Sequence, residues 1–363
     1  MDFTFSDDQI ALRDSVSRFL MTEAAPELLR EIWETDQGRS PELRAKLAEQ
    51  GLTAMSVPEA HGGLGLGDVD WALMTQELGY YAISDSLADT AYVAASLLSR
   101  LGEGHPLGQR WLPRIADGTA RIALAHPVNP WAADAQAAEL VLWAQPSDRG
   151  LALHALSPGT MSASALPSID ASRRLAVLSY TPTPATQVLA AEEAQALWDE
   201  TLDRAAVNVA GQLVGLAQRM LDLSVDYVAQ RKQFGKPIGS FQAVKHHLAD
   251  VATKIEFARP VLYRAALALA GGHRHRAALV SHAKLACADA AWTAGRKGIQ
   301  VHGAMGYTWE VDLQMFMKRA WALDAAWGDR AFHKARLAEA LLRDDAPLGP
   351  AATLYCAEGC SNG

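Results

Sequence analysis

The sequence has few cysteines, no long apolar run and no excess of positive charge. Its three cysteines are Cys287, Cys356 and Cys360; an odd count argues against a disulfide framework and fits a reducing compartment. No apolar run reaches the roughly 18 residues needed to span a bilayer. The first residues, MDFTFSDDQ, lack the basic and apolar segments of a secretory signal. The net charge of −8 offers no basic face for nucleic acid. We therefore expect a cytoplasmic protein without membrane or nucleic-acid partners.

Half of the 363 residues are hydrophobic and a fifth are charged, which is ordinary for a globular chain. That length allows two or three domains. Residues 1–118 have helical periodicity, and Ser6-Asp-Asp-Gln9 has the pattern of a capping box at a helix start. The glycines in HGGLGLG (61–67) lack a preceding strand pattern, so they predict a turn between helices in preference to a phosphate-binding loop.

Residues 119–193 differ from the helical segment before them. Four short apolar runs, RIALAHPV, AELVLWAQ, GLALHAL and RRLAVLSY, are separated by Pro, Asp, Ser and Gly, which predicts a small β domain. Residues 194–345 return to helical periodicity, with later helices over about 277–297 and 329–343. We expect these residues to form a four-helix bundle and 346–363 to be a flexible tail.

One stretch of residues 228–250, RKQFGKPIGSFQ, raises the question of function. Arg231, Lys232 and Lys236 lie within six positions of each other beside Phe234, in a chain that is acidic overall. A planar guanidinium with further donors and an aromatic ring suits a phosphorylated ligand. A second glycine-punctuated segment, GIQVHGAMGYTWE, is predicted to be a loop.

This order of domains resembles the acyl-CoA dehydrogenase family of flavoproteins. Four segments carry the resemblance: FTFSDDQIALRDSVSRFL, VPEAHGGLGLGDVDWALMTQELG, RKQFGKPIGSFQAVKHHLAD and GIQVHGAMGYTWE. The resemblance implies a mostly α fold with a small β domain: an N-terminal helical domain, a middle β-barrel-like domain and a C-terminal four-helix bundle. It also implies a dimer of dimers, with FAD lying across each dimer interface.

In such a dimer the neighbouring subunit contributes the RxxFG and glutamine-loop residues to the pyrophosphate and adenosine half of FAD. The matching positions here are Arg231, Gln233, Phe234 and Gln300, with Gly303 allowing close backbone approach. Where the family usually has a second glycine, this chain has Ala304. Read without the resemblance, Arg231 would be a solvated helix end and Gln300 a turn cap.

The catalytic carboxylate of the family is missing from both of its usual positions. At one position this chain has Trp327, whose indole has no basic lone pair, and at the other it has Ala205. Asp203 and Asp329 lie two residues from these positions and could replace the base, and His126, in the LAHPVNPWAAD segment of the β domain, is a third candidate. Caps, helix-end charges and local backbone bonding are the competing explanations for them.

The β domain also lacks residues that the family uses to bind flavin and substrate. Where relatives carry a segment of the type LTEP-G-GSD that holds the flavin ring and thioester, this chain reads LAHPVNPWAAD, keeping Pro127 and losing the Thr, Ser and glycines. The family's Trp-Ile-Thr segment has no clear counterpart. This chain therefore keeps the family's residues that contact the neighbouring subunit's FAD, and lacks those that bind flavin and thioester in its own subunit.

Three hypotheses follow. The first is a subunit of a heteromeric FAD-dependent acyl-CoA dehydrogenase, α2β2, in which a homologous partner supplies the base and binds most of the acyl-CoA substrate, such as a bulky steroid side-chain ester. Electrons would pass to an electron-transfer flavoprotein or a similar acceptor. The second is a self-sufficient homo-oligomer with a displaced base, and the third is a flavin-free scaffold. No metal is expected: His273 and His275 lack a third ligand, as do Cys356 and Cys360.

Overall fold

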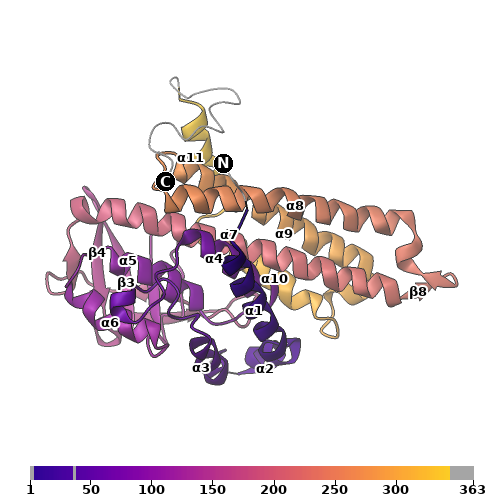
Figure 1. Ribbon diagram of the computed structural model, residues 1–363, viewed down its shortest axis with the longest axis horizontal. Coiled ribbons are helices and arrows are strands. Elements are labelled where there is room, and N and C mark those ends of the chain that lie inside the picture. Colours follow the sequence, from indigo (N-terminus) through magenta and orange to yellow (C-terminus); the bar gives the residue numbers. More distant parts are fainter. Residues whose placement is uncertain (1–3, 36–37, 344–363) are drawn as a thin grey trace.

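The computed structural model describes residues 4–35 and 38–343, and its elements fall into three regions (Figure 1). The N-terminal region is helical, and Ser6 and Gln9 close the predicted capping box. Its helices are α1 (Asp7–Glu23), α2 (Pro26–Glu34), α3 (Pro41–Glu49), η1 (Glu59–His61), α4 (Asp68–Tyr80), the π-helical η2 (Asp89–Ala94), α5 (Ala95–Ser99) and α6 (Pro106–Ala116). The glycine-rich segment lies between η1 and α4, as an interhelical turn.

The middle region consists of two small sheets. One has the strand order β1-β3-β4-β7 and the other β2-β6-β5; β1 and β3 are parallel and the other neighbours antiparallel. Each of the four apolar runs predicted as strands contains one, whereas β2, β5 and β7 were not predicted. The strands are β1 (Ile122–Ala125), β2 (Ala132–Ala133), β3 (Leu140–Ser147), β4 (Gly150–Leu156), β5 (Ser162–Leu166), β6 (Leu175–Ser179) and β7 (Gln187–Leu189), with η3 (Pro158–Thr160) before β5.

The C-terminal region is built around one long helix. It contains α7 (Ala191–Gln230), α8 (Gln242–Ala270), α9 (Arg276–His302), η5 (Gly303–Tyr307), α10 (Leu313–Asp324) and α11 (Arg330–Leu341). Helix α7 packs against α4, α8, α9, α10 and strand β4. Gly79 and Gly215 permit its close approach to α4, because a Cβ at either position would overlap the facing backbone. The fold class is as predicted, mostly helical with a small β region.

Two details of the predicted bundle were wrong. Helix α10 was not predicted, yet it packs against both α7 and α9. Helix α9 continues to His302, so Gln300 lies in its last turn and not in a loop. The domain boundaries at 118 and 193 stay a prediction. None of the described helices is long and apolar enough to cross a membrane.

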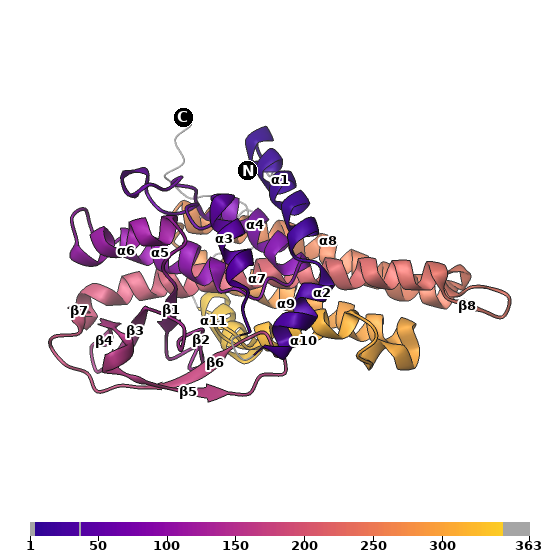
Figure 2. The same cartoon turned by 90° about the horizontal axis from the view of Figure 1, so that it is seen from below.

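A β-hairpin projects from one end of the bundle. It consists of β8 (Lys232–Gln233) and β9 (Lys236–Pro237), followed by η4 (Ile238–Ser240). Figure 1 and Figure 2 both place this hairpin at the end of the molecule opposite the β region. Helix α7 connects the two ends: its 40 residues, at 1.5 Å each, span about 60 Å.

Candidate functional site

The hairpin presents Phe234 to solvent. Phe234 and Gly235 form its two-residue turn, with φ of 52° and 78°, the pair of positive values that a tight hairpin turn requires. A phenylalanine rarely adopts positive φ. Its ring is 92% exposed and meets only the edge of Phe241 within the described chain, at a centroid distance of 6.1 Å. The backbone therefore holds a large apolar ring outward, where its own chain does not cover it.

Two of the three predicted ligand-binding polar side chains have no partner within the described chain, and the third, Gln233, is bonded locally. Arg231 is the C-cap residue of α7, and its backbone N–H donates to the carbonyl of Tyr227 at 2.8 Å. Neither the Arg231 guanidinium nor the Gln300 amide has a side-chain partner in the described part of the chain. Gln233 donates to the carbonyl of Lys232 at 2.8 Å. We call Arg231–Pro237 the hairpin arm.

The hairpin arm and the glutamine segment lie at the same end of the bundle. The ring of Tyr227, one turn before Arg231, stacks on His302 with centroids 4.1 Å apart and planes at 21°. Gly303 has φ of 62°, and Gly303 and Ala304 are exposed. The structure thus brings together the residues that the sequence assigned to a phosphorylated ligand.

The two positions that carry the carboxylate in the resembling family are buried and lack an ionisable group. Ala205 is fully buried in the first half of α7. Trp327 is 3% exposed and has φ of 53°. Its backbone N–H donates to Oδ1 of Asn129 at 3.2 Å. The next carbonyl, of Gly328, accepts from Nζ of the buried Lys284 at 3.1 Å. The chain therefore holds the backbone at the base position from several sides and buries the indole.

The three candidate replacement bases all have structural partners. Asp203 is fully buried and forms ion pairs with Arg276 at 3.1 Å and Arg336 at 2.7 Å. Asp329 is the N-cap of α11 and accepts from the N–H of Phe332 at 2.8 Å. Nδ1 of His126 accepts from the N–H of Val128 at 3.1 Å, and burial lowers the pKa of His126 to about 4. The contacts of Asp329 and His126 match the capping and local-bonding explanations, whereas that explanation was wrong for Asp203, which lies inside α7 and is held by two arginines from other helices.

A small cavity adjoins Trp327. Its volume is about 40 Å³, and its lining includes Arg39, Asp85, Asp89, Arg173 and Arg319 beside Trp327. Ligand pockets for small molecules usually measure about 300–1,000 Å³ and are mostly apolar. A cavity this small and this charged does not fit an acyl chain.

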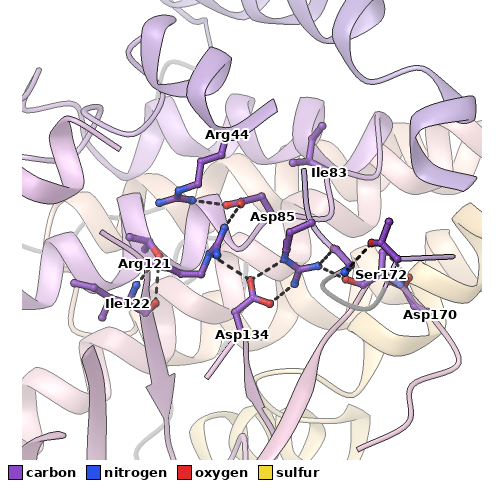
Figure 3. Close-up of polar contacts among 12 residues, drawn as sticks. Arg44, Ile83, Asp85, Arg121, Ile122, Asp134, Asp170 and Ser172 are labelled. Atoms are coloured by element: carbon purple, nitrogen blue, oxygen red, sulfur yellow. Dashed lines mark hydrogen bonds and ion pairs between the residues drawn. The ribbon is translucent and has the colours of Figure 1, made fainter. Parts of the chain in front are cut away.

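An extended ion-pair network surrounds that cavity (Figure 3). Asp85 pairs with Arg44 at 2.5 Å and with Arg121 at 2.8 Å. Asp134 accepts from Nε of Arg39 at 3.0 Å and lies 4.0 Å from Arg121. Burial by itself raises the pKa of Asp85, but Arg44 and Arg121 outweigh it and hold that pKa below its ordinary value. The charges of Asp85 and Asp134 are therefore paired within the chain, whereas Oγ of Ser86, which also lines the cavity, has no hydrogen-bond partner among the described residues.

The network continues into the bundle. Arg319 of α10 pairs with Asp170 and donates to Oγ of Ser172 at 2.6 Å. Its members come from all three regions of the fold. Sequence reasoning missed it, because each residue is unremarkable in its own segment and only the tertiary structure pairs them. Elsewhere in the described chain, no group of three or more His, Cys, Asp or Glu could hold a metal ion, and Cys356 and Cys360 lie outside the described residues.

Comparisons with known proteins identify the family. The family model described as the acyl-CoA dehydrogenase N-terminal domain matches residues 6–119, and that of the C-terminal domain matches residues 196–342. The chain belongs to the acyl-CoA dehydrogenase family. Members of this family are FAD-dependent oxidoreductases that act on acyl-CoA. The β region, where the sequence departs most from the family, lies between the two matched segments.

Three relatives illustrate the match. The acyl-CoA dehydrogenase IpdE2 of Mycobacterium tuberculosis is 33% identical over 320 residues, which are 85% of this chain and 89% of IpdE2. A chain of the ChsE4-ChsE5 complex from Mycobacterium tuberculosis shares the fold at 22% identity and a TM-score of 0.84, covering 95% of this chain and all of that one. The Tcur3481-Tcur3483 steroid ACAD shares the fold at 21% identity and a TM-score of 0.80, and the match covers 92% of this chain and 97% of that one.

The two ends of this acyl-CoA dehydrogenase chain differ in how well they suit the family's ligands. The free guanidinium and exposed aromatic ring of the hairpin arm, with the free amide of Gln300 in α9, suit the diphosphate and ring system of FAD. Beside Trp327 the residues do not fit an acyl-CoA thioester, because the cavity is small and charged. Two carboxylates line it, but Asp85 is paired with Arg44 and Arg121, and Asp89 accepts from the Asn208 amide at 3.1 Å.

Proposed function

We propose that this chain is a subunit of a heteromeric FAD-dependent acyl-CoA dehydrogenase, assembled as α2β2 with a homologous chain. The partner chain supplies the catalytic carboxylate, the flavin-ring pocket and most of the acyl-CoA site. This chain supplies its hairpin arm, Gln300, Gly303 and Ala304 to the partner's cofactor. The complex works in the cytoplasm and passes electrons to an electron-transfer flavoprotein or a similar acceptor.

The observation that carries the proposal is the position of Phe234 and Arg231 relative to Ala205. Ala205 and Arg231 are separated by roughly 39 Å along α7. Groups that far apart do not act on one reacting centre. An exposed ring in a strained backbone conformation, beside an unpartnered cation, needs a ligand from outside its own chain.

Each residue has a defined part in this arrangement. The planar guanidinium of Arg231 pairs with two phosphate oxygens, and the amides of Gln233 and Gln300 donate further hydrogen bonds. Phe234 forms an apolar wall against the flavin or adenine. Gly303 allows the backbone to approach, and the methyl group of Ala304 narrows that approach slightly. FAD, when bound, would supply the acceptor for the hydride leaving the β carbon of the thioester, and the partner's carboxylate would take the α proton.

The substrate proposed is a bulky CoA ester, such as that of a steroid side chain. A half-empty pair of sites leaves room for a large acyl group. The fold shared with the Tcur3481-Tcur3483 steroid ACAD supports this class and no finer identification. A panel of straight-chain and steroid-ring CoA esters would measure the preference.

The test is co-expression with a homologous acyl-CoA dehydrogenase chain encoded beside this one. We expect a heteromer by native mass spectrometry, a visible flavin spectrum and acyl-CoA oxidation, none of which the isolated chain shows. Within the heteromer, Arg231→Gln should weaken FAD retention, whereas Lys254→Gln, which removes an exposed pair with Asp289, should not.

Two results would contradict the proposal. An isolated chain that forms a homo-oligomer with one FAD per chain and oxidises acyl-CoA would establish a self-sufficient enzyme with a displaced base. A colourless, stable complex with the partner would establish a flavin-free scaffold.

A further inference from the structure

The cavity beside Trp327 is lined by an arginine with one unoccupied edge. Nη1 of Arg173 donates to the carbonyl of Ala322 at 2.5 Å. Its Nε and Nη2, which lie on the same side of the planar guanidinium, have no hydrogen-bond partner among the described residues, and both are accessible to a water molecule. No carboxylate of the described chain forms an ion pair with Arg173. This edge is therefore free to bind two oxygens of a ligand.

Two other arginines of the chain show what such an edge binds. Nε and Nη2 of Arg204 donate to the two carboxylate oxygens of Asp68, at 2.9 and 3.3 Å. Arg39 holds Asp134 through the same two nitrogens. Burial lowers the pKa of Arg173, whereas in Arg204 the Asp68 carboxylate outweighs burial and raises the pKa. A planar fork of this kind matches a planar oxyanion, so Arg173 lacks only the oxyanion.

Two oxygen atoms on the other side of the cavity also lack partners. Oγ of Ser86, a residue that is 9% exposed, has no hydrogen-bond partner among the described residues. Asp89 accepts from Nδ2 of Asn208 at 3.1 Å through Oδ1, and its Oδ2 has no partner there either. Asp89 begins η2, and such π-helical turns are rare and often lie at functional sites. Since buried polar groups are nearly always hydrogen-bonded, these atoms indicate a bound ligand or water.

Size and charge narrow the choice of ligand. A volume of about 40 Å³ holds about three waters, which is the size of a planar ion of three or four heavy atoms. Three arginines and two aspartates line the cavity, and their ion-pair partners in the network of Figure 3 add two arginines and two aspartates. The cluster thus has one positive charge in excess when all of these groups are ionised. A ligand with a single negative charge would balance it.

We propose that this cavity binds a small planar oxyanion with one negative charge. Two of its oxygens pair with Nε and Nη2 of Arg173, and the hydroxyl of Ser86 donates to an oxygen of the ion. Two ions share this chemistry: formate offers only acceptors, whereas bicarbonate also has a hydroxyl that donates to Oδ2 of Asp89. The inference does not depend on the proposed function, because it concerns the folded chain by itself and involves no flavin.

The experiment titrates the purified full-length chain with formate and, separately, with bicarbonate. Calorimetry at about pH 8 keeps Asp89 ionised, because burial raises its pKa only to about 6. Gluconate, a monovalent anion too large for the cavity, holds the ionic strength constant, and chloride tests charge without planar shape. We expect saturable binding, tighter for bicarbonate than for formate, and an unfolding temperature that rises with the concentration of the bound ion. Tighter binding of formate would support the oxyanion site and identify a simple carboxylate as its ligand.

Two variants and a control locate the binding. Arg173→Gln should weaken it at least tenfold, because a charge-assisted pair of hydrogen bonds is lost. Ser86→Ala removes a hydroxyl that has no partner in the described chain, so it should leave the fold intact and weaken binding roughly threefold. Arg110→Gln is the matched control, since Arg110 is exposed and lies 5.0 Å from the Trp111 ring in the N-terminal region. It should leave binding unchanged.

Three results would overturn the inference. Equal unfolding temperatures in formate, bicarbonate and gluconate, with no saturable heat, would show that the cavity holds only water. Unchanged binding in both Arg173→Gln and Ser86→Ala would place the bound ion elsewhere on the chain. Equal affinity for chloride would show that the site selects charge and not a planar oxyanion. Failure of the chain to form a flavin-containing heteromer would contradict the proposed function and leave these measurements unaffected.

Discussion

His333 donates its Nε2–H to the carbonyl of Trp327 at 3.0 Å, and its Nδ1 accepts from Oγ of Ser281 at 3.1 Å. Acceptance at Nδ1 requires a neutral ring, which agrees with a His333 pKa lowered to about 4, chiefly by burial. With Asn129 and Lys284, His333 holds Trp327 in a left-handed conformation that costs about 1–3 kcal/mol for a residue other than glycine. The backbone at the base position is therefore fixed by its surroundings.

Restoring a carboxylate at this position should not restore catalysis. We expect Trp327→Glu to lower the free energy of unfolding by about 3 kcal/mol or more, because it leaves a cavity and buries a charge. Its chain alone should not bleach flavin on addition of acyl-CoA, because the adjoining cavity is too small. Urea unfolding and flavin absorbance measure both effects, with Trp327→Phe as the milder variant. Flavin bleaching by the isolated Trp327→Glu chain would contradict this account.

The stacked pair of Tyr227 and His302 should couple the hairpin arm to the glutamine segment. Tyr227→Leu removes the stacking and the hydroxyl that donates to the carbonyl of His302 at 3.4 Å. We expect a loss of about 1 kcal/mol in the free energy of unfolding and weaker FAD binding by the heteromer. Tyr227→Phe keeps the ring and should retain most of both. Equal FAD affinity in all three proteins would show that the two segments act independently.

The candidate ligand residues of the hairpin arm could be found from the sequence because their signal is local: three cations lie within six positions of each other beside Phe234. The hairpin itself was not predicted, because a phenylalanine rarely adopts the positive φ that Phe234 has in its turn. The ion-pair network was not, because Arg44, Asp85 and Arg121 come from segments that meet only in the folded chain. Helix α10 was missed for a different reason. Buried residues such as Gln314 and Arg319 interrupt its apolar pattern, so its helical periodicity is weak.

Breaking the buried ion-pair network around Asp85 should lower the free energy of unfolding. Asp85→Asn leaves Arg44 without its counter-charge and Arg121 with only Asp134 at 4.0 Å, and removing one partner of a buried pair typically costs about 3–5 kcal/mol. Asp14→Asn is the matched control, because Asp14 and Arg13 form an exposed pair that should contribute less than about 1 kcal/mol. Thermal or urea unfolding measures the difference. Equal stability of the two variants would show that the network is not stabilising.

Asp89 should make the free energy of unfolding depend on pH, with a sign opposite to the contribution of the buried histidines. Burial raises the pKa of Asp89 from 3.8 to about 6, although Arg173 lowers it in part. At a pH between these two pKa values, Asp89 holds a proton in the folded protein but not in the unfolded chain. Its contribution to the free energy of unfolding therefore falls as pH rises through this window.

The substitution Asp89→Asn isolates that contribution. Buried His126 and His333, with pKa values of about 4, have the opposite slope, since they bind protons more weakly in the folded state. They are present in both proteins and cancel in the difference. We expect the variant to gain up to about 3 kcal/mol relative to the unmodified chain as pH rises from about 4 to about 7. Urea unfolding at a series of pH values gives the difference curve, and a flat curve would show that Asp89 remains ionised in the fold.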